Sequence, residues 1–460
     1  MAEELYKIDA LRSAHRAMAL QPRGEIILAA RGGKGGIYYG WYIVAASFLI
    51  LFITTGIGFY TFSVFMLPLE KFFGASRTEI ASYASLMALV AGFATPLIGW
   101  LYHAWGPRKV IGFGAVVVAS GYLLLSRSTQ VWHLYAIAVL VGVGLSATTL
   151  IPNQTIISHW FVKKRGRAMG IMMMGIALGG IVWAPLAHDL IERFQWQGAF
   201  VIFGLAIAAI VVPIALLVLR PSPQSMGLAP DGVDLPTDGG TAALHANVER
   251  LAGPGLTVQQ AVRTVPFWSM FAINFFMILG TSIVTLHIVG IVTASPFGVA
   301  KGTEAAMLIG SRAIRDFLIV SVAGRFLGGY VAERFSKRYV LFGLYLIMIG
   351  SAVLLFRLDN ATAFYAFILL YGLGMGGSAV VYPLLLAENF GLGSFSKLLG
   401  IMGIAFTLGA AIGQVGAAKI YDGTGSYTGV FVLLIGVFAV SSALTLLSRP
   451  PRNSPCPETA

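Results

Sequence analysis

The sequence contains 460 residues, of which 57% are hydrophobic and 11% are charged, and its mean hydropathy is +0.82. Soluble globular domains carry about 25% charged residues, so this composition excludes that class and indicates an integral membrane protein. The formal net charge of +12 does not indicate nucleic-acid binding, because the basic residues lie in short clusters between apolar runs. The single cysteine, Cys456, excludes a disulfide framework and a thiolate metal site.

Residues 1–36 precede the first apolar run. They carry mixed charge and contain no apolar segment of the length found in a signal peptide. We therefore expect a cytoplasmic N-terminal extension that takes no part in a helical bundle.

Twelve apolar runs follow, each long enough to cross a bilayer core of about 30 Å as a helix. A polar segment rich in Pro, Gly and Asp separates two sets of six runs. The predicted fold class is an all-α membrane protein with twelve transmembrane helices in two pseudo-symmetric six-helix bundles. The expected spans lie near residues 40–67, 80–102, 108–126, 132–158, 168–190, 198–219, 267–293, 310–332, 338–356, 362–386, 397–418 and 428–447.

The two sets of spans repeat at an offset of 230 residues, which predicts two similar bundles with a ligand site between them at mid-depth. Gly99, for example, corresponds to Gly329, and Arg108 corresponds to Arg338. The predicted domains are an N-terminal bundle at 37–220, a central cytoplasmic loop at 221–264, a C-terminal bundle at 265–448 and a tail at 449–460.

The loops indicate the orientation of the chain in the membrane. Basic residues gather on one side, notably at residues 163–167 and 334–338, whereas the loops on the other side balance basic against acidic residues. The positive-inside rule then places both termini in the cytoplasm. We expect a multi-pass protein of the plasma membrane, in contact with lipid.

One arginine lies in the middle of an apolar run. Arg325 is roughly 14 Å along a helix from the pair Arg315/Asp316, at about 1.5 Å per residue. It is roughly 12 Å from the pair Glu333/Arg334 on the other side, which places it near the midplane of the bilayer. A charge there costs about 2.5 kcal/mol or more, so it is expected to face a bundle interior and to bind an anion. The alternative is an arginine that only braces neighbouring helices.

The segment GWLYHAWGPRK at residues 99–109 resembles the loop signature that the major facilitator superfamily carries between its second and third helices, and GYVAERFSKR is its copy in the second half. The signature usually has an aspartate at the position of His103, whereas Glu333 keeps the acid in the second copy. In that family the acid holds the cytoplasmic ends of the two halves together. The resemblance therefore implies a latch that involves Arg108, Glu333 and Arg338.

The segment WFVKKRGRAMGIMMMG at residues 160–175 is similar to the signature of monocarboxylate transporters, and the YGW segment at 39–41 resembles the end of their first-helix motif. The acidic residue of that motif is absent here, since Gly36 stands in its place. Bacterial members of this branch carry lactate, pyruvate and similar acids, and oxalate:formate antiporters are close relatives. The resemblance covers about residues 38–448 and implies alternating-access transport of a small monocarboxylate, coupled to protons.

Residue by residue, Arg325 matches the eighth-helix arginine that binds the substrate carboxylate in these transporters. Their aspartate four residues earlier is replaced by Ser321, and their first-helix lysine falls at Tyr60; both departures concern proton coupling. The eleventh-helix lysine that gives oxalate antiporters a second cation has no counterpart in the middle of residues 398–418. One buried charge fits a monoanion better than a dianion. An oxalate:formate-type exchanger and a sensor that does not transport remain as alternatives.

Four more polar residues lie on spans expected near the axis between the bundles. Tyr60, Asn274, Tyr371 and Tyr382 are candidates for the substrate site, with helix packing as the alternative role. His287, near the outer end of the seventh span, is a candidate proton carrier because a histidine titrates near neutral pH. Its alternative role is a structural hydrogen bond.

In the superfamily fold the second span meets the eleventh, and the fifth meets the eighth. Glu79 and Lys419 end the first of these pairs on the outer side. Asp189 and Arg315, or alternatively Arg312, end the second. The resemblance predicts that these opposite charges close the outer side in the inward-facing state; the alternative is that they are solvated end charges.

The spans contain no HExxH segment and no GxSxG segment, so we expect no enzyme and no catalytic residue. We also expect no metal and no cofactor. The expected partners are a monocarboxylate anion, protons and the lipid bilayer, and the expected functional unit is a monomer.

Overall fold

The structure is a computed structural model that describes residues 37–231 and 256–449. The expected N-terminal extension, the middle of the central loop and the tail after Arg449 lie outside the described residues. The first bundle consists of α3 (Gly40–Thr55), η1 (Gly56–Tyr60), α4 (Phe62–Phe73), α5 (Arg77–Phe93), α6 (Thr95–Leu125), α7 (Val131–Thr148), α8 (Leu150–Trp160), α9 (Arg165–Ala206), η2 (Ile207–Val211) and η3 (Ile214–Val218).

A connecting region follows the first bundle, and its described parts contain η4 (Pro223–Met226) and α11 (Val258–Val262). Thr257 caps α11, because its hydroxyl accepts a hydrogen bond from the backbone N–H of Gln260. The second bundle consists of α12 (Val265–Ala294), α13 (Pro296–Lys301), α14 (Thr303–Arg334), α15 (Lys337–Leu354), η5 (Leu355–Arg357), α16 (Ala361–Phe390), α17 (Phe395–Thr424) and α18 (Thr428–Leu447).

Two of these long helices contain a sharp reversal and so hold parts of two spans. In α6 the reversal is at Gly106, whose φ of 78° suits a residue without a Cβ, and Pro107 follows it. In α9 it is at Gln195, with φ 60°. Nine described stretches are long and apolar enough to cross a membrane, and Arg165–Val218 is long enough for two spans. The nine stretches therefore account for ten spans. The span that starts with α5 and the span formed by α14 bring the number in the described chain to twelve, which confirms the predicted fold class.

Glycines let the helices within each bundle approach at backbone distance. A Cβ at Gly175 or Gly179 of α9 would collide with backbone oxygens of α3. A Cβ at Gly409 or Gly413 of α17 would collide in the same way with α12. These are the two GxxxG spacings of the fifth and eleventh spans, and they act at equivalent places in the two bundles.

The two bundles contact each other through two helix crossings. In the first, Gly166 and Gly170 of α9 lie against the backbone of Gly329 and Arg325 in α14. In the second, α17 lies against α6, and two hydrogen bonds join these helices. Thr95 Oγ1 donates to the Gly400 carbonyl oxygen at 2.8 Å, and Ser396 Oγ donates to the Gly99 carbonyl oxygen at 3.0 Å.

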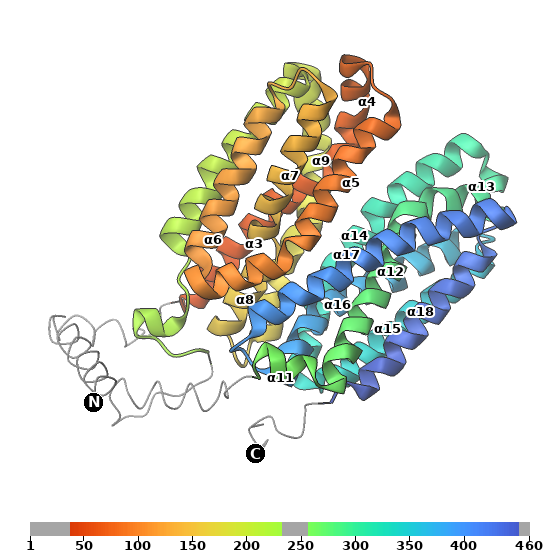
Figure 1. Cartoon of the computed structure of the whole chain (residues 1–460). Coiled ribbons are helices and arrows are strands. Elements are labelled where there is room, and N and C mark those ends of the chain that lie inside the picture. Colours follow the sequence, from red (N-terminus) through yellow and green to blue (C-terminus); the bar gives the residue numbers. More distant parts are fainter. Residues whose placement is uncertain (1–36, 232–255, 450–460) are drawn as a thin grey trace, which may run out of the picture.

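These crossings obey the repeat, because the 230-residue offset relates Thr95 to Arg325 and Gly170 to Gly400. They confirm the expected pairing of the fifth span with the eighth and of the second with the eleventh. Both lie toward the end of the molecule at which α3 begins and α18 ends, which we call the closed end. Figure 1 shows the bundles diverging from there toward the opposite end, which we call the open end.

An ion pair joins the bundles at the closed end. The Glu333 carboxylate accepts hydrogen bonds from the Arg167 backbone N–H at 2.7 Å and from Arg167 Nε at 2.6 Å. The repeat relates Glu333 to His103 and Arg167 to Lys397, and His103 lies close enough to Lys397 to interact electrostatically. One crossing therefore carries an acid against a base, whereas its copy carries a histidine against a lysine.

We predict that Glu333→Gln shifts the protein toward the state in which the open end closes. The lost charge-assisted bonds are worth roughly 1–2 kcal/mol after discounting for the exposure of Arg167, or about 5- to 30-fold in the equilibrium. The measurement is the distance between two spin labels, one near the open end of each bundle. The shift should appear as a larger fraction of molecules with a short distance between the labels. Suitable label sites are exposed positions near the open end of each bundle, Trp132→Cys and Val299→Cys, in a Cys456→Ser background.

The matched control is Glu388→Gln, which breaks an ion pair with Lys337 inside the second bundle at 2.6 Å. It removes the same charge and keeps both hydrogen bonds between Glu333 and Arg167, and it weakens only the electrostatic attraction between Glu388 and Arg165 of α9. His103→Asp supplies a compensating variant, since it places an acid beside Lys397 and should reverse the shift caused by Glu333→Gln. Equal distances in Glu333→Gln and Glu388→Gln would show that the ion pair does not hold the closed end.

Candidate functional site

Arg325 is buried between the two bundles, and no described residue supplies it with an acidic partner. Its side chain is only 5% exposed. Nη1 donates to Ser321 Oγ at 2.8 Å, while Nε has no hydrogen-bond partner. Among the described residues no carboxylate forms an ion pair with it. A buried guanidinium has five donors to satisfy, so this site has spare capacity for an anion.

The course of α14 sets the direction in which Arg325 points. The Cα–Cβ bonds of a helix tilt toward its N-terminus, and α14 begins at the open end. Ser321 lies one turn earlier on the same face and is fully buried, and its own hydroxyl donates to the Leu318 carbonyl oxygen at 2.7 Å. The guanidinium therefore extends toward the open end, while Gly170 of α9 packs against the backbone of Arg325.

Tyr60 approaches Arg325 from the first bundle. It is the last residue of η1, a short π-helical segment that interrupts the first span, and such segments occur often at functional sites. Gly180 of α9 makes room for its ring, because a Cβ there would lie 3.0 Å from the ring carbons. The Tyr60 hydroxyl and the Arg325 guanidinium are close enough to interact electrostatically.

The other three candidates for the substrate site bond to backbone carbonyls within the second bundle. Asn274 Nδ2 donates to Met402 at 2.7 Å and joins α12 to α17. Two tyrosine hydroxyls of α16 donate to α12, Tyr371 to Thr281 at 3.3 Å and Tyr382 to Met270 at 3.1 Å. These bonds fix helix positions, so the structure brings Tyr60, and not these three, to Arg325.

His287 lies on α12 near the open end. Its Nε2 is 3.1 Å from the Gln414 carbonyl oxygen of α17, and its ring is half-buried beside Tyr427, with ring centroids 6.1 Å apart. This hydrogen bond uses Nε2 and does not involve Nδ1, the other ring nitrogen. The structure thus gives His287 a hydrogen bond between helices, and a role in proton transfer stays a prediction.

The charged residues expected at the outer gate do not pair across the bundles in the described chain. Asp189 and Lys419 are exposed, and Arg312 is exposed as well. Arg315 and Glu79 have partners close to them in the sequence. The gate therefore stays a prediction for the state in which the open end has closed. Arg315 binds its neighbour Asp316 at 2.8 Å, and Glu79 accepts hydrogen bonds from Ser76 in the cap of α5.

The two repeat-related arginines of the loop signature have different partners. Arg108 Nη2 donates to the Leu216 carbonyl oxygen at 2.6 Å, at the end of the sixth span. Arg338 Nη2 donates to the Tyr339 hydroxyl at 2.8 Å, and the guanidinium lies 4.7 Å from the centroid of that ring. Neither arginine bridges the bundles through a bond found in the described chain; Glu333 makes that connection through Arg167.

The segment of residues 160–175 folds against the start of the first span. The Trp160 and Phe161 rings are fully buried and pack on the aromatic residues around YGW, with Trp41 and Phe161 centroids 5.1 Å apart. Tyr38 donates its hydroxyl to the Trp160 carbonyl oxygen at 2.9 Å. Asp231 accepts hydrogen bonds from the backbone after Phe161. This packing explains why the two sequence segments occur together.

Sequence reasoning missed Arg167 as the latch partner and Asp231 as the residue that fixes this loop. The 230-residue offset could have indicated Arg167, because it and Lys397 are both basic at equivalent positions. Asp231 carried no signal, since its contact depends on how the central segment returns to the bundle. Within the described ranges, no group of three or more His, Cys, Asp and Glu side chains could hold a metal ion.

Comparisons with known proteins agree with this geometry. Monocarboxylate transporter 13 of Bos taurus is 27% identical over 90% of this chain and 89% of its own length, and monocarboxylate transporter 2 of Rattus norvegicus is 26% identical over 89% and 82%. The crystal structure of FucP, a major facilitator superfamily transporter in the outward conformation, matches with a TM-score of 0.67 at 14% identity, over 89% of this chain and 100% of that one.

The model of the Major Facilitator Superfamily matches residues 48–314 and 300–460, which together cover most of the sequence. The described chain also contains twelve helical spans in two bundles that are related by the repeat. The chain therefore belongs to the major facilitator superfamily and is a multi-pass membrane transporter.

Proposed function

We propose that this protein carries a small monocarboxylate, of the lactate or pyruvate type, across the plasma membrane by alternating access. The observation that carries the proposal is the buried Arg325, whose Nε has no partner and whose charge has no carboxylate beside it in the described chain. The names of the cattle and rat relatives, both monocarboxylate transporters, agree with an anionic substrate.

In this proposal the substrate carboxylate compensates the charge of Arg325. A guanidinium at mid-membrane is costly when unpaired, and a bidentate carboxylate offsets that cost through two charge-assisted hydrogen bonds. The Tyr60 hydroxyl faces the same charge from the other bundle, so a bound anion contacts both halves. Substrate binding then eases passage through the occluded state, because the bound carboxylate offsets the cost of a guanidinium that is closed off from water.

The same proposal assigns the sides of the membrane. The basic segments at residues 163–167 and 334–338 lie at the closed end, so this end faces the cytoplasm, together with both termini. The open end then faces outward, as in the FucP structure. Transport requires the contacts at the closed end to separate while the open ends of the bundles approach each other.

We predict that Arg325→Ala abolishes carboxylate uptake in proteoliposomes while the protein still folds and inserts. Truncation removes the counter-charge but few packing contacts. Arg325→Lys should also be impaired, because an ammonium lacks the planar fork that binds both carboxylate oxygens. The measurement is uptake of labelled lactate, pyruvate, formate and oxalate at equal protein density.

Arg357→Ala is the matched control for this prediction. It removes an exposed arginine at the end of η5 and should leave uptake unchanged. Uptake by Arg325→Ala at the level of the control would refute the assignment of Arg325. Absence of uptake of every tested acid by the unmodified protein would favour a sensor without transport activity.

The single buried cation also predicts selectivity. Lactate, pyruvate and formate should compete with labelled substrate, whereas oxalate should compete poorly, because its second carboxylate would remain without a counter-charge. Competition curves in proteoliposomes measure the order. If oxalate is the tightest competitor, a second cationic group takes part, and the alternative of an oxalate:formate-type exchanger holds.

We further propose that uptake is coupled to protons, with His287 as the carrier. Uptake should then be faster at lower outside pH, because a higher outside proton concentration drives proton-coupled entry. His287→Gln keeps a side-chain donor for the Gln414 carbonyl oxygen but cannot titrate, so it should flatten the pH dependence. An unchanged pH profile in this variant would leave His287 with a structural role alone.

A further inference from the structure

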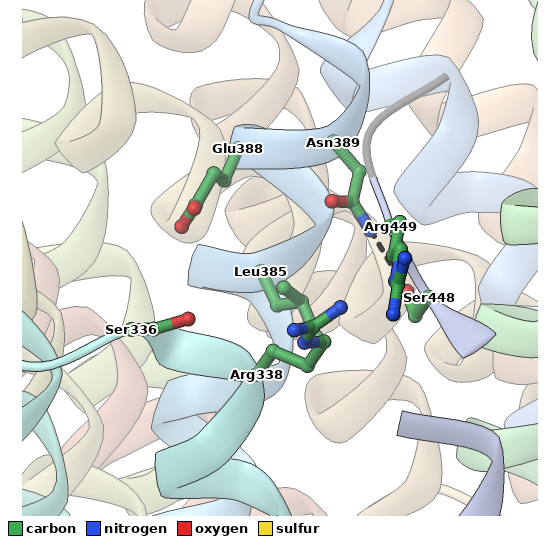
Figure 2. Close-up of a pocket in the computed structure, with 7 residues that line it drawn as sticks. All are labelled: Ser336, Arg338, Leu385, Glu388, Asn389, Ser448 and Arg449. Atoms are coloured by element: carbon green, nitrogen blue, oxygen red, sulfur yellow. Dashed lines mark hydrogen bonds between the residues drawn. The ribbon is translucent and has the colours of Figure 1, made fainter. Parts of the chain in front are cut away.

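A cavity of about 590 Å³ opens at the closed end of the second bundle, where α15 begins and where α16 and α18 end. Figure 2 shows Arg338 and Arg449 approaching it from two different elements. Asn389 and Ser448 form its wall, and Asn389 Nδ2 donates to Ser448 Oγ at 2.8 Å. The cavity is separate from the proposed substrate site, since Arg325 lies roughly 14 Å before the end of α14 at Arg334, whereas Arg338 lies at the start of the next helix at the closed end.

The charge of this cavity is positive. Glu388 also lines it, but Lys337 binds that carboxylate at 2.6 Å and offsets its charge. Arg338 uses one of its five donors on the Tyr339 hydroxyl. The Arg449 side chain is exposed and makes no hydrogen bond or ion pair within the described residues. Among the described residues, two guanidinium groups at the cavity therefore have no anionic partner.

The first bundle provides an internal comparison, because the repeat places equivalent residues at its own closed end. Arg108, the counterpart of Arg338, donates to the Leu216 carbonyl oxygen at the end of the sixth span. The counterpart of Arg449 is Arg220, because each ends the last span of its half and is followed by a proline. Arg220 Nη1 donates to the Leu217 carbonyl oxygen at 3.0 Å. Both arginines of the first bundle thus donate to backbone carbonyls of that bundle. In the second bundle the Arg449 side chain has no such bond within the described residues, and a cavity lies beside it.

The surroundings of the cavity indicate the source of the anion. Three large side chains that are adjacent in sequence to residues lining the cavity are exposed by 58–66%: Tyr339, Leu447 and Phe335. Such side chains at the end of a membrane span face lipid. A headgroup in the cavity could therefore keep its acyl chains along this apolar surface, which a free anion does not need.

We propose that Arg338 and Arg449 bind the phosphate of an anionic phospholipid, with phosphatidylglycerol as the representative headgroup. Each guanidinium presents a planar fork that fits two phosphate oxygens. Asn389 Oδ1 has no hydrogen-bond partner in the described chain, and in Figure 2 it points away from Ser448. A small rearrangement of this amide supplies an acceptor for a headgroup hydroxyl, which phosphatidylglycerol has and phosphatidylcholine lacks.

The test measures binding of short-chain phosphatidylglycerol to the full-length protein in detergent, by titration calorimetry. The expected results are saturable binding at least tenfold tighter than that of short-chain phosphatidylcholine, and a loss of about tenfold in Arg449→Gln, which corresponds to 1.4 kcal/mol. Arg338→Gln should cause a similar loss. Arg357→Gln, which removes an exposed arginine at the open end, is the matched control and should bind as the unmodified protein does.

Three outcomes would overturn the proposal. Equal binding of phosphatidylglycerol and phosphatidylcholine would show that the site does not select an anion. Unchanged binding in both Arg338→Gln and Arg449→Gln would place the lipid elsewhere. If inorganic phosphate alone displaces the lipid at equal concentration, the acyl chains contribute nothing and the site is one for a free phosphate. Melting temperatures of the variants within about 2 °C of the unmodified protein would show that folding is intact.

Discussion

The constraint on which the structure depends is a guanidinium held near mid-membrane with no carboxylate beside it in the part of the chain that the structure describes. Burial of Arg325 is tolerable only where polar groups surround it, and the fold provides them at the meeting point of the two bundles. Ser321 accepts one bond from the same helix, and Tyr60 faces the charge from the opposite bundle. The incomplete compensation leaves the site ready for an anion, because binding one removes an electrostatic cost that the protein otherwise bears.

The glycines of the two helix crossings position this charge. Gly170 packs on the backbone of Arg325, and Gly400 packs in the same way on Thr95, the residue related to Arg325 by the repeat. The backbones are close enough that a Cβ at either glycine would collide with a carbonyl oxygen. The same scaffold therefore presents a threonine at one crossing and an arginine at the other, and only the second can attract an anion.

The positions for which we propose functional roles are positions at which the two copies of the repeat differ in residue or in bonding partner. His103 and Glu333 occupy equivalent positions, so one crossing at the closed end has an ion pair and the other does not. Arg220 and Arg449 are also equivalent, yet Arg220 donates to a backbone carbonyl of its own bundle whereas Arg449 lines a basic cavity. In the proposals made above, such asymmetry lets two halves with one architecture respond differently to substrate, to protons and to lipid.

The sequence by itself determined the membrane class, the twelve spans, the repeat and the position of Arg325 in the middle of a span. These follow from the cost of exposing polar backbone or charge to lipid, and that cost is visible in composition and periodicity. Only the tertiary structure decided the hydrogen-bond partners. Tyr60, Asn274, Tyr371 and Tyr382 are alike as polar residues on inner spans, yet only Tyr60 approaches the arginine. The difference depends on helix rotation and on local events such as the π-helical turn at η1, which no residue type encodes alone.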